Sequence, residues 1–424
     1  MDKKWWYIGS LSIFSILIVF AVCVRKHSQK NDVDNVKTIS TEANDSSETG
    51  EVVLDEEISD NVMGLIDFVI DVETGKNPVV LHLTDSQIID SAQVRYETRL
   101  AENAKKYWAT DKIEERCYSY IREVITKIQP DFIILTGDIV YGEFDDNGTA
   151  LESFIAFMEN FQIPWAPVFG NHDNESNKGV DWQCQQFENA EYCLFKQRDL
   201  TGNGNYTVGI RQDDTIKRVF FMLDSNGCGN ASKESIANGH TRIVEGFGND
   251  QIEWYTKTAQ TIKKCSKGTK ISFAFHIQLT VFADAFAKYG FVNNETMRAV
   301  NIDEHPDRQE GDFGYLGKVL KSPWDADYAV WKGLKKLGVD SIFVGHEHCN
   351  SASVVYEGVR CQYGQKISTY DRANFVGIDG RIVGTYFGDI TGTRKAIMGG
   401  TVIPLSAKTG EITKTYIYLC GDQN

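Results

Sequence analysis

The stretch VVLHLTD at residues 79–85 is a largely apolar run that ends abruptly in a carboxylate. Apolar runs that end in a polar side chain able to bind metal or phosphate recur along the chain. They return at residues 132–138 (FIILTGD), 165–172 (WAPVFGNH), 219–224 (VFFMLD), 271–276 (ISFAFH) and 342–348 (IFVGHEH). Runs of this kind are typical of strands that are buried on both faces. Between them, residues 121–128 and 151–158 place apolar side chains at i, i+3, i+4 and i+7, which predicts helices. Strands that alternate with helices predict an α/β fold built from packed layers.

Polar side chains that can bind a metal ion or a phosphate stand at the carboxyl ends of these predicted strands. They are Asp85, Asp138, Asn171, His172, His276, His346 and His348. This set holds four of the eight histidines of the chain. In α/β sheets, ligands bind beyond the carboxyl ends of the strands, so the side chains are expected to converge. Phosphoryl transfer is served by two cations about 3.5–4 Å apart, and carboxylates, imidazoles and an amide can hold such a pair.

Five short blocks carry a family resemblance. In chain order they are TDSQ (84–87), GDIVY (137–141), GNHD (170–173), FAFH (273–276) and GHEH (345–348). Their order resembles the five-block signature of calcineurin-like metallophosphoesterases, over residues 78–350. The resemblance implies a four-layer double β-sandwich flanked by helices, with a dimetal site at the carboxyl ends of the strands. It also implies that Asp138 bridges two metal ions, that Asp85 and His348 bind the first, and that Asn171, His276 and His346 bind the second.

The family implies an activity, which is the metal-dependent hydrolysis of phosphoric esters by a metal-bound hydroxide at a dinuclear centre. His172 would face the substrate, stabilise the transferring phosphoryl group and protonate the leaving oxygen, and Asp173 would orient it. The blocks GNHDNES, LDSNG, FHIQL and GHEHCN are similar to the branch with purple-acid-phosphatase-related membrane enzymes, which favours phosphomonoesters. Two alternatives stay open: a phosphodiesterase on the same site, and an exported, non-catalytic binding protein with a degenerate metal site.

Gln87 departs from the family pattern, because the first block is usually DxH and here reads DSQ. Gln87 could bind metal through its amide oxygen, which suits magnesium, manganese or iron better than zinc. Tyr141 could supply the missing ligand instead, since GDIVY is similar to the GDxxY block of purple acid phosphatases, where a tyrosinate binds ferric iron. In a third interpretation the first metal site is weak or lost. The expected cofactor is two divalent or mixed-valence ions of manganese, iron or zinc.

The N-terminus differs from the rest of the chain. Residues 5–24 carry no charge and are flanked by lysines and an arginine, and about 20 helical residues span a bilayer. Residues 1–27 are therefore predicted to be a transmembrane helix that anchors the chain to a membrane, or else a cleaved signal. Residues 28–60 are polar and acidic, which predicts a disordered stalk. The phosphoesterase domain is placed at residues 61–424, outside the cytoplasm on a membrane or secreted.

Charge and cysteine usage narrow the function further. The net charge is −15, with 59 acidic and 44 basic residues, so the chain would repel polyanions and no nucleic-acid binding is expected. A phosphate-ester substrate is the expected partner.

Nine cysteines include no CxxC pair, so no structural zinc site is predicted. Cys184 and Cys193 could form a disulfide or stay buried thiols. Residues 354–419 have short runs and Gly-rich turns, which predicts an antiparallel closing region.

Overall fold

The computed structural model describes residues 62, 64–90, 92–93, 113–227, 246–291, 300–317, 327–368, 373–376, 382–385 and 395–421. The predicted membrane anchor or signal at residues 1–27 and the predicted stalk at 28–60 lie outside these ranges. Within them, no helix combines the length and the apolar character needed to cross a membrane. The anchor, the stalk and the location outside the cytoplasm stay predictions from the sequence.

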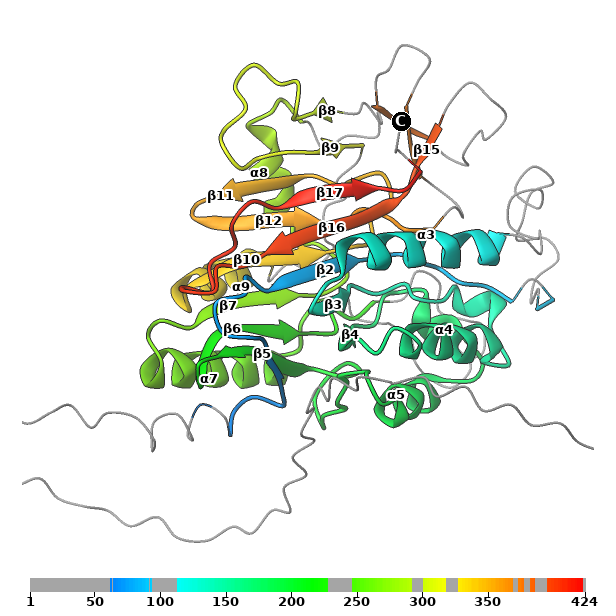
Figure 1. Cartoon of the computed structure of the whole chain (residues 1–424), viewed down its shortest axis with the longest axis horizontal. Helices are drawn as coiled ribbons and strands as arrows, with labels where there is room; N and C mark the ends of the chain where they lie inside the picture. The colour runs from blue at the N-terminus through cyan, green and yellow to red at the C-terminus, as the bar shows by residue number, and fades with distance from the viewer. Residues whose placement is uncertain are drawn as a thin grey trace, which may run out of the picture.

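Two large β-sheets form the centre of the fold (Figure 1). The first has seven strands in the order β1 (Phe68–Asp71), β5 (Tyr206–Gln212), β6 (Thr215–Met222), β7 (Lys270–Ala274), β10 (Val339–Val344), β12 (Val359–Tyr363) and β11 (Ser353–Tyr356). The second has five strands in the order β17 (Tyr416–Leu419), β16 (Gly399–Pro404), β2 (Val79–Leu83), β3 (Phe132–Leu135) and β4 (Trp165–Pro167). Smaller sheets are β14 (Ile382–Thr385), β13 (Ala373–Val376) and β15 (Lys395–Ile397), and β8 (Val300–Asn301) with β9 (Tyr315–Leu316).

The two large sheets pack face to face through aromatic side chains. Phe132 on β3 meets Phe220 on β6 with ring centroids 5.7 Å apart, and His82 on β2 meets Phe343 on β10 at 5.8 Å. Neighbouring residues on the same strands point to the opposite faces, because side chains alternate along a strand. Phe221, next to Phe220, stacks on Phe273 at 4.8 Å on the outer face of the seven-stranded sheet. Both faces are thus buried, which explains the apolar runs in the sequence.

Helices cover the outer faces of both sheets. On the five-stranded sheet, the buried side chains of three helices join its core: α3 (Ile113–Ile128), α4 (Thr149–Glu159) and α5 (Val180–Asn189). On the seven-stranded sheet, the corresponding helices are α7 (Asn249–Cys265), α8 (Val281–Ala287) and α9 (Asp327–Lys336). The predicted helical patterns at 121–128 and 151–158 fall within α3 and α4. The arrangement is a helix-flanked pair of sheets, as the α/β prediction and the family resemblance expected.

Strand direction brings the candidate ligands to one edge. β2, β3 and β4 are parallel, as are β6, β7 and β10, so the loops that follow them leave on the same side of each sheet. The C-terminal part is antiparallel at β11–β12 and β16–β17, as predicted, although β12 also runs parallel to β10. β16 lies beside β2 and completes the five-stranded sheet.

The cysteines outside the predicted anchor are thiols where they are described. Cys184 and Cys193 are both buried and neither forms a disulfide, so the alternative interpretation, that they are buried thiols, holds. Buried thiols act as small apolar side chains, and both belong to the core around the five-stranded sheet.

A candidate metal centre at the sheet edge

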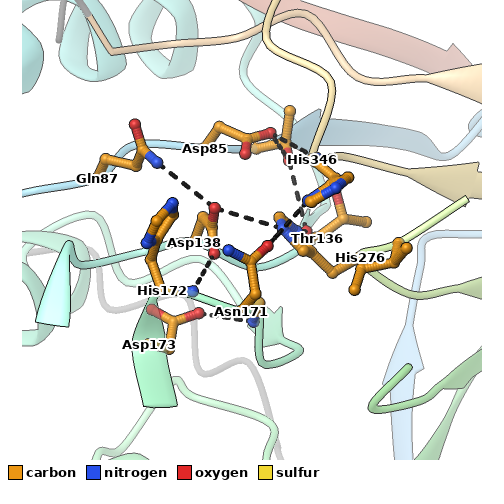
Figure 2. Close-up of polar contacts among 12 residues, drawn as sticks. Asp85, Gln87, Thr136, Asp138, Asn171, His172, Asp173, His276 and His346 are labelled. Carbon is orange, nitrogen blue, oxygen red and sulfur yellow. Dashed lines mark hydrogen bonds and ion pairs between the residues drawn. The ribbon is translucent and has the colours of Figure 1, made fainter. Parts of the chain in front are cut away.

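The loops that follow five strands meet at the edge of the sandwich (Figure 2). Asp85 follows β2, Asp138 follows β3, Asn171 and His172 follow β4, His276 follows β7, and His346 and His348 follow β10. The structure therefore brings together side chains that are up to 263 positions apart, as the difference between residues 85 and 348 shows. Asp138 is central: its carboxylate faces His276, Gln87 and the backbone of His172.

The backbone of these loops is strained where the ligands stand. Asp85, Gln87, Asp138 and His346 all have positive φ values, of 53°, 42°, 50° and 71°. Residues other than glycine avoid this left-handed region. Each one costs about 1–3 kcal/mol and persists only where the surrounding structure enforces it. Strain of this kind gathers at functional sites, where it holds side chains in an orientation that the relaxed chain would not adopt.

Glycines in the motifs let the loops approach one another. A Cβ on Gly170 would lie 2.3 Å from both the backbone nitrogen and Oδ1 of Asp138. A Cβ on Gly345 would lie 2.1 Å from Oγ1 of Thr84 and 2.9 Å from Oδ2 of Asp85. No side chain fits at either distance, so these glycines are required for close packing of the ligand loops.

Four predicted ligands of the second metal ion converge with suitable spacing. Oδ1 of Asn171 lies 2.8 Å from Nδ1 of His346 and 3.1 Å from Nε2 of His276, and that Nε2 lies 3.4 Å from Oδ2 of Asp138. Ligand atoms bound about 2.1 Å from one ion are separated by roughly 3.0–3.4 Å in octahedral or tetrahedral geometry. The observed separations fall close to that range. These residues fit a metal ion.

The hydrogen bonding around His276 and Asp85 supports the same conclusion. Nδ1 of His276 donates to the carbonyl of Thr136 at 2.7 Å, so Nε2 is the nitrogen that faces the site and would bind a metal ion on losing its proton. Asp85 is held by Thr84, whose hydroxyl donates to Oδ2 at 2.7 Å, while the buried Oδ1 lies 3.2 Å from Nε2 of His348. Ligand atoms of Asp85, Asp138 and His276 all lie within 4.8 Å of one another.

The site attracts positive charge. Burial by itself would raise the pKa of Asp138, but His276 and His172 outweigh it and hold the pKa well below its usual value. Burial would lower the pKa of His276, yet Asp138 and Asp85 raise it to about 10. Asp138 is therefore ionised at neutral pH, and a cation beside it is stabilised.

His172 stands next to this cluster with two contacts that hold it. Its backbone N–H donates to Oδ1 of Asp138 at 2.8 Å, and its Nδ1 lies 2.9 Å from Oε2 of Glu175. Tyr141 stacks on the imidazole, with ring centroids 4.0 Å apart. Burial would lower the pKa of His172, but Asp138 and Glu175 outweigh it and raise the pKa to about 9.

The structure corrects the expectation that Asp173 orients His172. The carboxylate of Asp173 accepts hydrogen bonds from the backbone N–H groups of Val140 at 2.9 Å and Gly170 at 2.7 Å, so it ties two ligand loops together. Glu175 holds the imidazole instead. The block GNHDNES contained both carboxylates, and a spacing of three residues in a short helical turn was the signal that could have selected Glu175.

The surroundings of Gln87 and His348 contain a residue that sequence reasoning missed. Lys366 follows β12 and is buried, and its Nζ lies 3.0 Å from Oε1 of Gln87 and 3.0 Å from Nδ1 of His348. Nε2 of His348 faces Oδ1 of Asp85 at 3.2 Å, and Nε2 of Gln87 faces Oδ2 of Asp138 at 3.4 Å. The metal-binding roles predicted for Gln87, His348 and Tyr141 stay predictions.

Comparison with known proteins assigns the chain to a family. The model of the calcineurin-like phosphoesterase family matches residues 78–350, and the chain belongs to this family. Members of the family use dinuclear metal centres. The chain is similar to "Phosphatase DCR2" of Saccharomyces cerevisiae, with 27% identity over 251 residues, which is 56% of this chain and 39% of that protein.

A plant relative has a higher sequence identity over an alignment of similar length. "Probable inactive purple acid phosphatase 14" of Arabidopsis thaliana is 36% identical over 269 residues, which is 58% of this chain and 60% of the relative. The chain thus spans less than two thirds of the length of these curated relatives. Among solved structures, a dimetal phosphatase from Danio rerio is 11% identical with a TM-score of 0.42, covering 81% of this chain and 98% of that one. A similarity that low adds nothing to the assignment.

Proposed function

We propose that this protein hydrolyses phosphoric esters, phosphomonoesters first, in a metal-dependent reaction. The observation that carries the proposal is the convergence of Asp138, Asn171, His276 and His346 at the spacing of metal ligands, with His172 fixed beside them. Family membership supports the same reaction class.

Metal bound at this cluster would supply Lewis-acid polarisation of the phosphoryl group and a more acidic water. The residues of the chain supply position and a proton. The side chain of His172 is 16% exposed, whereas those of Asp138 and His276 are almost fully buried, so solvent reaches His172, as it does the partly buried His346. Because Glu175 is hydrogen-bonded to Nδ1 of His172, the other ring nitrogen, Nε2, is the atom that can donate to a phosphoryl or leaving-group oxygen.

The first test is turnover of 4-nitrophenyl phosphate and of its bis-ester by the full chain supplied with manganese, iron or zinc. The proposal expects metal-dependent release of nitrophenol, faster from the monoester, and a loss of roughly 100-fold or more in His172→Ala with metal content preserved. Faster turnover of the bis-ester would favour the phosphodiesterase alternative.

A second candidate function is a non-catalytic metal-binding member of the family. Two features support it: the replacement of the usual histidine by Gln87, and the name of the Arabidopsis relative "Probable inactive purple acid phosphatase 14". Wild-type protein with full metal occupancy that turns over neither ester would establish this candidate and refute the first.

We further propose, from the N-terminal sequence, that residues 1–27 anchor the chain to a membrane or direct its export, with the phosphoesterase domain outside the cytoplasm or secreted. Protease accessibility of the domain in intact cells tests this, because an intracellular domain would be protected. No nucleic-acid partner is proposed, and the acidic charge of −15 supports that choice.

A further inference from the structure

Lys366 reaches the two side chains that the family pattern would give to the first metal ion. Its ammonium lies 3.0 Å from Oε1 of Gln87 and 3.0 Å from Nδ1 of His348, and the lysine is 1% exposed. An ammonium only donates hydrogen bonds, so both partner atoms must accept from it. This requirement decides how the two side chains are protonated and oriented.

The contact with Lys366 sets the tautomer of His348. Because Nδ1 accepts a hydrogen bond, the neutral imidazole carries its proton on Nε2, the nitrogen that faces Asp85 at 3.2 Å. A nitrogen that binds metal must be unprotonated, and the other nitrogen then donates to an acceptor such as a carbonyl. His276 satisfies this condition through the carbonyl of Thr136, at 2.7 Å. His348 is held in the opposite tautomer.

The same contact sets the orientation of Gln87. Its amide oxygen accepts from Lys366, so its amide NH₂ faces Oδ2 of Asp138 at 3.4 Å. Turning the amide over would place NH₂ against the ammonium and oxygen against the carboxylate, and both contacts would be repulsive. An amide NH₂ offers no lone pair to a cation, so Gln87 does not present a ligand atom to the site in this arrangement.

The charge of Lys366 works in the same direction. A metal ion at the first position would be a second cation in a buried space that already holds an ammonium, and like charges repel strongly where water is excluded. The first half-site, unlike the second, does not fit a metal.

We propose that Lys366 takes the place of the first metal ion, so that the protein binds a single ion through Asp138, Asn171, His276 and His346. The inference rests on the proposed metal-dependent function and deepens it by stating how many ions the site holds. It selects the third of the interpretations that the DSQ block left open and supplies its physical cause.

The test measures metal content and the magnetic state of bound manganese in the full chain. Metal-free protein is saturated with Mn²⁺, freed of excess ion, and examined by elemental analysis and electron paramagnetic resonance. One ion per chain with the spectrum of an isolated Mn²⁺ is expected. The variant Gln87→His with Lys366→Met restores the usual first block and removes the ammonium, and it should bind two ions per chain with an exchange-coupled spectrum.

The matched control is Lys263→Met, because Lys263 is also partly buried and its Nζ donates to the carbonyl of Thr269 at 2.8 Å, away from the centre. This variant should keep one ion. Two ions in the wild type, or one isolated ion in a folded double variant, would overturn the inference. Should the double variant fail to fold, the wild-type stoichiometry decides alone.

Metal content and ester turnover separate the two proposals. One ion per chain without turnover of either ester leaves the inference standing and refutes the proposed function. Two ions per chain with metal-dependent turnover refutes the inference and supports the proposed function. No bound ion at saturating Mn²⁺ refutes both, since both require the half-site of Asp138, Asn171, His276 and His346.

Discussion

Replacing Glu175 by glutamine should slow the chemical step without emptying the metal site. Oε2 of Glu175 lies 2.9 Å from Nδ1 of His172, the side chain of Glu175 is 1% exposed, and Glu175 is not one of the proposed metal ligands. A hydrogen bond to a charged group contributes about 1.5–3 kcal/mol, and one between neutral groups about 0.5–1.5 kcal/mol. Glutamine keeps an acceptor oxygen, so the change loses the difference, about 1–1.5 kcal/mol.

Converted at about 1.4 kcal/mol per factor of ten, this predicts a fall in kcat of roughly 5- to 15-fold. The loss should depend on the leaving group. Glu175 raises the pKa of His172, so without its charge the imidazole is protonated less of the time, which matters most where the departing oxygen needs a proton. Glu175→Gln is therefore assayed against 4-nitrophenyl phosphate and against a simple alkyl phosphate, whose alkoxide is a far poorer leaving group. A larger loss with the alkyl ester is expected.

Asp173→Asn serves as the comparison, because Asp173 bonds two backbone N–H groups and does not hold the imidazole. It should lower the melting temperature and reduce turnover of both esters by the same factor. An equal loss for the two esters in Glu175→Gln, or no loss while His172→Ala is inactive, would refute the role assigned to Glu175.

Three further changes test the energetics of the fold and the site. Burial lowers the pKa of His82 to about 3, so its stabilising contribution is present above pH 6.5 and is lost as pH falls toward 3. In urea unfolding, the wild type should lose about 1.4 kcal/mol relative to His82→Gln between pH 7.5 and 5.5. Gly170→Ala should abolish metal binding, measured by elemental analysis, because the new Cβ would lie 2.3 Å from the carboxylate of Asp138. Gly268→Ala is the control and should bind metal normally, because a Cβ there has nothing within 4 Å. Asp340→Asn should lower stability by about 2–3 kcal/mol, since the fully buried Arg218 loses its bidentate partner at 2.7 and 2.8 Å; an unchanged denaturation midpoint would show that the pair contributes little.

Periodicity and composition alone predicted the layered architecture. The run VVLHLTD is largely apolar because β2 packs against β10 of the other sheet through His82 and Phe343, while the opposite face lies toward α3. A strand buried on both faces is apolar at nearly every position, so the local sequence pattern was sufficient to predict it. The candidate ligands followed from the same reasoning, since parallel strands release their loops at one edge.

Roles that depend on contacts across the fold could not be predicted in this way. Glu175 and Asp173 stand two residues apart as similar carboxylates in one loop, and only the path of the backbone shows which of them meets the imidazole. Lys366 comes after the last motif, 279 positions from Gln87, in a segment without a recognisable pattern. A lysine ordinarily extends into solvent, so its sequence context gave no reason to place it in a buried centre.

The sequence by itself determined which strands are buried, where their polar ends fall and which family the blocks resemble, because each of these depends on neighbours along the chain. Only the tertiary structure decided the tautomer of His348, the orientation of Gln87 and the partner of His172. Those properties follow from hydrogen-bond donors and charges that distant segments bring within about 3 Å, a distance at which one ammonium or carboxylate determines what a side chain can bind.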